Sequence, residues 1–118
     1  LYPYHLKNLG DCTIEDFCEM IKELVNLIGE DNIGIGSDLC LNWPDDVVMW
    51  MRNGKWTKDI DYGESKDKNP KWPKLPSWYK QPSDLNNLFY LMCENNIPEK
   101  VSTKIIGQNW FNFMKNQF

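Results

Sequence analysis

The residues from 31 to 46 read DNIGIGSDLCLNWPDD, and they include the acid best placed to do chemistry. The first half has the pattern of a short buried strand, in which Ile33 and Ile35 alternate with glycines before the stretch reaches Ser37 and Asp38. A carboxylate at the carboxyl end of such a strand is suited to act as a general acid or base, or as a metal ligand. The alternative interpretation is that Asp38 caps the following segment or is an ordinary loop acid.

Two further side chains could contact a substrate. His5 is the single histidine, and it follows the expected end of a preceding strand, so it could face the same site, although a lone histidine is more often structural. Arg52 could bind a substrate carboxylate through two parallel hydrogen bonds, or it could form a surface ion pair. A metal site needs several ligands that converge on one point. One histidine and four scattered cysteines do not supply them, so we expect no complete metal site in this chain.

Six tryptophans are many for a chain of 118 residues, and most of them lie between residues 39 and 82. This segment shows no regular period, and ordered loops of such length usually serve a function. Trp43 could form the wall of a substrate pocket or contact a second subunit in a homodimer. The alternative is that the tryptophans pack the loop itself, which has no secondary structure of its own.

The composition excludes some classes of protein. A net charge of −4 argues against nucleic-acid binding, which needs a basic surface. No apolar run approaches the roughly 20 residues that cross a bilayer. No two cysteines have the C-x-x-C spacing of a zinc or redox site, and their scatter does not suggest a disulfide framework. The compartment, cytoplasm or periplasm, stays open.

One helix is clearly predicted over residues 14–28, because apolar residues recur there at steps of three and four and form one stripe. Thr13 is a natural N-cap, with Asp16 as the capping-box partner. Gly29 is placed to end the helix in a left-handed turn.

The last third of the chain is also predicted to be helical. The first helix there has Ser83 as its cap, the second runs from Pro98 to Gly107, and the third has Asn109 as its cap. The apolar stripe of the first helix consists of Leu85, Leu88, Phe89 and Met92. The buried anchors of the third helix are expected to be Trp110, Phe113 and Met114.

The order of elements at the beginning predicts an α/β fold. A strand end within LYPYHL, the helix over 14–28 and the strand at 33–36 form the tail of a βαβ unit, which implies a parallel sheet. A lone strand would leave buried backbone groups unpaired, at a cost of about 1–3 kcal/mol each. We therefore expect the chain to be the C-terminal part of a larger α/β domain whose upstream part supplies the other strands. A first residue that is leucine agrees with this expectation.

Two motifs of this chain resemble the membrane (renal) dipeptidase family. DNIGIGSDLC is similar to that family's last-strand motif, G-[IL]-G-[SG]-D-[FL]-D-G, and DLNNLFYLMCENNIPEKVSTKIIGQNWFNFM is similar to its ending. The stretch from Trp43 to Trp56 resembles an insertion found in a bacterial branch. The resemblance covers nearly all of this chain but only the C-terminal third of a complete family member.

The resemblance implies a (β/α)8 TIM-type barrel of the amidohydrolase kind, two zinc ions and hydrolysis of dipeptides. Residues 1–118 would hold the end of strand seven, helix seven, strand eight, the insertion loop at 39–82 and the closing helices. Asp38 would be the proton shuttle that takes a proton from the nucleophilic water and passes it to the leaving amine. The zinc ligands would all lie upstream, so the isolated chain is expected to be inactive.

Three positions depart from the family motifs, and the first two of them place the chain in a divergent branch. Cys40 replaces the second aspartate of the strand motif, Leu41 replaces the glycine that follows it, and Gln108 replaces a glycine of the G-G-N motif. Two alternatives to the dipeptidase stay open: a non-catalytic interaction module that uses the tryptophan-rich loop, and an inactive truncated product.

Overall fold

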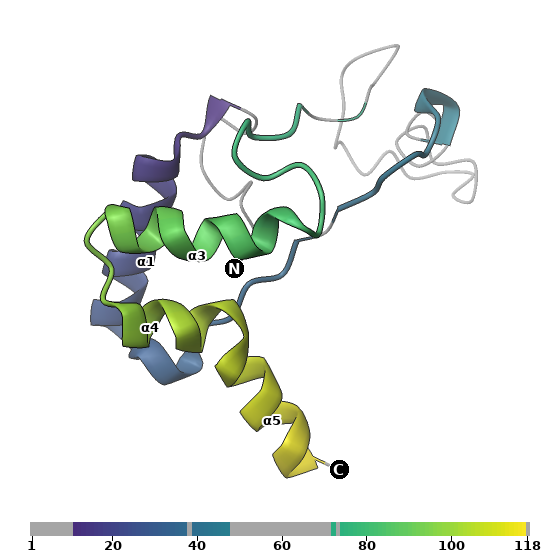
Figure 1. The fold of residues 1–118 in the computed structure, drawn as a ribbon. Helices are drawn as coiled ribbons and strands as arrows, with labels where there is room; N and C mark the ends of the chain where they lie inside the picture. Colours follow the sequence, from purple (N-terminus) through teal and green to yellow (C-terminus); the bar gives the residue numbers. More distant parts are fainter. Residues whose placement is uncertain (1–10, 38, 48–71, 73, 118) are drawn as a thin grey trace, which may run out of the picture. The chain divides into compact units, whose positions relative to one another are not determined.

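The computed structural model describes residues 11–37, 39–47, 72 and 74–117. The chain divides into two compact units. The helical unit consists of Leu1–Leu39 together with Lys74–Phe118, and the second unit is Cys40–Pro73. Figure 1 labels the helices of the helical unit. No helix among the described residues is long and apolar enough to cross a membrane.

Helix α1, Ile14–Ile28, begins as predicted. The Thr13 hydroxyl accepts from the Asp16 N–H at 3.1 Å, and the Asp16 carboxylate accepts from the Thr13 N–H at 3.2 Å, which confirms the capping box. Gly29 ends the helix with φ 84° and ψ 150°. The positive φ was expected, but this ψ lies in an extended region that only glycine readily adopts, so the predicted left-handed turn is wrong. A 3₁₀ turn, η3, follows at Glu30–Asn32.

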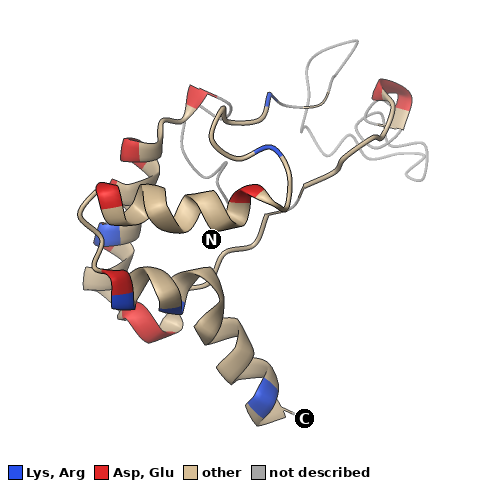
Figure 2. Ribbon diagram, viewed as in Figure 1, with Lys and Arg blue, Asp and Glu red and all other residues tan. Residues whose placement is uncertain are grey.

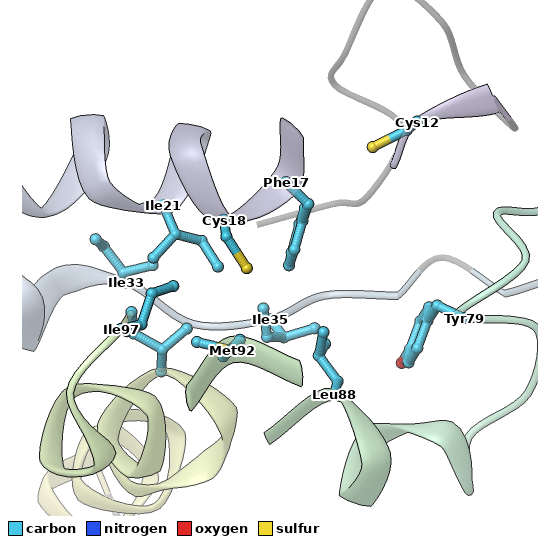
Figure 3. Close-up of a cluster of buried hydrophobic side chains, with 11 residues drawn as sticks. Cys12, Phe17, Cys18, Ile21, Ile33, Ile35, Tyr79, Leu88, Met92 and Ile97 are labelled. Carbon is cyan, nitrogen blue, oxygen red and sulfur yellow. The ribbon is translucent and has the colours of Figure 1, made fainter. Parts of the chain in front are cut away.

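The predicted α/β fold, a segment of a (β/α)8 barrel, is contradicted. Every regular element of the described residues is a helix, and none is a strand. Residues 33–37, which we call the extended segment, follow the expected course, since Ile33 has φ −117° and ψ 133°. Figure 3 shows Ile33 and Ile35 on this segment, between the side chains of α1 and those of Leu88 and Met92.

Helices supply the hydrogen bonds that a neighbouring strand was expected to make. The Ile35 N–H donates to the Ile105 carbonyl at 3.3 Å. The Trp110 indole N–H donates to the Ile35 carbonyl at 2.9 Å. The amide of Asn109 donates to the Ile33 carbonyl at 2.7 Å. Alternating apolar residues predict an extended, buried backbone. They do not specify which groups form hydrogen bonds with its N–H and carbonyl groups.

The C-terminal helices are α3 at Asp84–Glu94, α4 at Glu99–Thr103, the π-helical turn η4 at Lys104–Gln108, and α5 at Asn109–Gln117. The prediction that a helix stops at Gly107 is wrong, because the turn continues and the Asn109 N–H donates to the Lys104 carbonyl. Asn109 therefore lies inside a continuous helical run, and its side chain bonds to η3 and the extended segment instead of capping α5.

The side-chain cap predicted for helix α3 is absent, and the first residue of the helix bonds to the turn before it. Ser83 occupies the N-cap position but makes no side-chain capping bond. Instead the Asp84 carboxylate accepts from the Lys80 N–H at 2.8 Å and the Gln81 N–H at 3.2 Å. These bonds hold the pKa of Asp84 below its usual value, and the bond from Lys80 has the largest effect.

The core of the helical unit draws on α1, the extended segment, α3 and η4. Its members are Cys12, Phe17, Cys18, Ile21, Ile33, Ile35, Tyr79, Leu88, Met92, Ile97 and Ile105. The predicted stripe of α3 is partly confirmed, since Leu88 and Met92 are fully buried.

The predicted buried anchors of α5 are wrong. Trp110 is 45%, Phe113 58% and Met114 51% exposed, and Phe111 beside them is 59% exposed. Figure 2 shows α5 without acidic residues and with a single basic one near its end. The apolar spacing predicted a buried face, but the described residues leave about half of each of these side chains exposed.

The second unit contains one described helical turn at residues 45–47. The Pro44 carbonyl accepts from the Val47 N–H at 3.2 Å and from the Trp72 indole at 3.3 Å. The expected insertion at 39–82 overlaps this unit but also reaches into the helical unit, which begins again at Lys74.

Candidate functional site

The structure places one of the four predicted site residues. Asp38, His5 and Arg52 lie outside the described residues. Trp43 is described and is 61% exposed, so its ring is available to solvent or to a partner. What the structure does describe is the chain on both sides of position 38, which includes Ser37 and Leu39.

The extended segment that leads to position 38 is fixed along its length. Asn109 donates its amide hydrogens to two carbonyls, those of Glu30 and Ile33, both at 2.7 Å. Ile33 is 3% and Ile35 9% exposed, so the segment is also held by apolar packing. The segment is therefore anchored at Ile33 and Ile35.

Gly34 allows α5 to approach this segment. A Cβ atom at Gly34 would lie 2.6 Å from the Trp110 indole nitrogen and 3.0 Å from two of its ring carbons. The same nitrogen donates to the Ile35 carbonyl. The glycine of the motif is therefore required by contact with the indole, and the sequence did not reveal this partner.

An ion-pair cluster ties η4 to the turn that precedes the extended segment. The Lys104 ammonium group donates to the carboxylates of Glu30 and Asp31. These two bonds raise the pKa of Lys104 above its usual value, and the bond with Asp31 has the larger effect. With the side chain of Asn109, they attach both ends of the π turn to residues 30–33.

Ser37 and Leu39 are linked across position 38. The Ser37 hydroxyl accepts from the Leu39 N–H at 3.4 Å, a long bond of the kind that serine makes two residues along a turn. Tyr79 is 3% exposed. Burial raises the pKa of the Tyr79 phenol, and the Ser37 side chain opposes this rise.

Sequence reasoning missed Tyr79. Its placement depends on a local turn, since its N–H donates to the Pro76 carbonyl at 3.2 Å. It depends also on the preceding Trp78, whose indole donates to the Cys12 carbonyl at 2.9 Å and whose ring lies 4.9 Å from that of Phe17. No periodic pattern in this part of the sequence predicted that Tyr79 would be buried.

The described residues do not fit a zinc site. They contain no group of three or more histidine, cysteine, aspartate or glutamate residues that could hold a metal. Burial raises the pKa of the Cys18 thiol to about 11 and raises that of Cys12. Zinc binds the thiolate form, which these buried thiols do not favour. Any zinc in the protein would need ligands from outside the described residues.

Comparisons of this chain with protein-family models, curated proteins and solved structures found no match. The likeness to the dipeptidase family therefore depends on the sequence motifs alone.

Proposed function

We propose that this chain is part of a dipeptidase related to the membrane dipeptidase family, with Asp38 as its proton shuttle. The single observation that carries the proposal is the way the motif around Asp38 is held. Ile33 and Ile35 are buried in the extended segment and are held by bonds from Asn109 and Trp110, and the motif acid follows this segment directly in the sequence. A general acid or base needs this kind of fixed approach to its substrate.

The proposed role of Asp38 is proton transfer in both halves of peptide hydrolysis. Its carboxylate accepts a proton from water as the water oxygen bonds to the peptide carbonyl carbon. It then returns this proton to the amide nitrogen as the carbon–nitrogen bond breaks, which releases two amino acids. General acid–base catalysis of this kind contributes roughly 10²–10⁴-fold to the rate.

The family's zinc ions enter the proposal only through the resemblance. Their expected ligands lie upstream of residue 1, and the described residues do not replace them. We therefore assign to this chain the proton transfer and the support of Asp38, and no step at a metal.

The test is hydrolysis of a panel of dipeptides by the full-length protein that contains this chain. Asp38→Asn is expected to lower kcat by at least about 100-fold, because the amide cannot accept the proton. Asp46→Asn, an exposed acid of the same stretch, is the matched control and should leave kcat unchanged. Unchanged turnover in the Asp38 variant would rule out the proposal.

An interaction module is the second candidate. The observation that favours it is the exposure of large apolar side chains, among them Trp43 and several residues of α5. Large exposed apolar patches commonly mark contacts with other proteins. If the chain is an interaction module, the Asp38→Asn protein keeps its biological activity and the Trp43→Ala protein loses it. If the chain is part of a dipeptidase, Asp38→Asn is the more damaging of the two substitutions.

A further inference from the structure

Helix α5 carries a group of large apolar side chains that are about half exposed. We call this group, which consists of Trp110, Phe111, Phe113 and Met114, the α5 face. At the helical period these four positions fall on one side of α5, and its asparagines fall on the other side. An apolar side of a helix that is this exposed commonly marks a contact with another protein.

The charges of α5 favour a second α5 face as the partner. The helix contains no acidic residue and one basic residue, Lys115, near its end (Figure 2). A partner that recognises charge would find little to bind there, although the whole chain has a net charge of −4. Two α5 faces bring no acids together, and in an antiparallel pair the two lysines lie at opposite ends of the contact.

The residue types of the α5 face differ from those of the core. Most members of the core in the helical unit are isoleucine or leucine, namely Ile21, Ile33, Ile35, Leu88, Ile97 and Ile105. The α5 face has neither of these types and consists of tryptophan, phenylalanine and methionine, which are enriched in contacts between proteins. The rings of Trp110 and Phe113 already pack edge to face, with centroids 6.2 Å apart. This composition favours an interface over a further layer of core.

We propose that the α5 face is the contact of a homodimer, in which two copies of α5 pack against each other about a two-fold axis. The four half-exposed side chains offer about 100 Å² each, so two copies would bury about 800 Å². Stable interfaces bury roughly 1,200–2,000 Å², so we expect a weak dimer that depends on concentration. The proposal is independent of the role of Asp38, and it uses a different surface from a homodimer through Trp43, which belongs to the second unit.

The test is analytical ultracentrifugation of the full-length protein that contains this chain, over a range of concentrations. Phe111→Glu should raise the Kd of the dimer at least about tenfold, because each copy loses a ring of the contact and gains a carboxylate in it. Asn116→Glu is the matched control, since it adds the same charge at an exposed position on the other side of α5. It should leave the Kd unchanged, and circular dichroism should show that both variants are folded.

A charge exchange tests whether the α5 face meets itself. The Phe111→Glu and Phe111→Lys proteins should each associate weakly alone. Their mixture should form heterodimers at least about fivefold more tightly than either variant forms homodimers, because opposite charges replace like charges across a contact of two identical faces.

Three outcomes would overturn the proposal. A protein that stays monomeric up to about 1 mM would show that another part of the protein covers the α5 face. A dimer whose Kd does not respond to Phe111→Glu would place the contact elsewhere. A mixture that associates no more tightly than its components would show that the face does not meet itself. None of these measurements uses the reaction, so hydrolysis by the Asp38→Asn protein decides the proposed function separately.

Discussion

Gly34 shows at the scale of one residue how closely the extended segment and α5 approach each other. The indole of Trp110 occupies the place where a side chain at Gly34 would be, while its nitrogen donates to the Ile35 carbonyl. A methyl group there must push the ring outward and break that hydrogen bond. Trp110 is 45% exposed, so the ring has room to move, but it cannot move and keep its bond.

We therefore predict that Gly34→Ala lowers the free energy of unfolding by about 1–3 kcal/mol, the usual cost of overpacking. Gly107→Ala is the matched control, because a Cβ there would meet nothing within 4 Å. Gly107 lies in a helical turn, so alanine should raise the free energy of unfolding by about 0.5–1 kcal/mol. Urea denaturation followed by circular dichroism measures both. Equal effects of the two substitutions would show that the indole does not restrict Gly34.

At the scale of elements, the sequence predicted what depends on near neighbours. Thr13 and Asp16 of the capping box lie three positions apart, so the sequence pattern predicted it. The apolar stripe of α1 follows the helical period and was predicted in the same way. The extended backbone at Ile33 agrees with the alternating pattern, whereas the strand predicted at residues 33–36 is absent. The hydrogen-bond partners of this segment were not predicted, because Asn109 and Trp110 lie more than 70 positions away. The strand pattern suggested a sheet, whereas side chains of a helical run satisfy this backbone.

Asn109 contributes most to this replacement of sheet hydrogen bonds by helix side chains, because its amide bonds to two backbone carbonyls. We predict that Asn109→Asp lowers the free energy of unfolding by about 1–3 kcal/mol, because two partly buried carbonyls lose their donor and face a carboxylate instead. Asn112→Asp is the matched control, since Asn112 is exposed and accepts from the Gln108 amide, as an aspartate also would. Thermal denaturation of the two variants gives the comparison, and similar melting temperatures would contradict the prediction.

At the scale of the whole molecule, the described residues support the extended segment but do not form a metal site. Within the helical unit, η4 and α5 bond to the backbone of Ile33 and Ile35. Its described residues include no group of three or more side chains that could hold a metal. The sequence did not predict the exposed apolar face of α5, since spacing shows which side of a helix is apolar but not whether anything covers it.

The absence of a metal-ligand group among the described residues leads to the last prediction, which concerns zinc. We expect the 118-residue chain supplied with zinc to hydrolyse no dipeptide above background, because the motif acid alone does not bind the metal that the resemblance implies. The full-length protein should hydrolyse dipeptides, lose this activity on treatment with a chelator and regain it when zinc is returned. Zinc bound to each polypeptide, measured by elemental analysis after gel filtration, gives an independent readout. Turnover by the short chain that Asp38→Asn abolishes would show that its own residues complete the site.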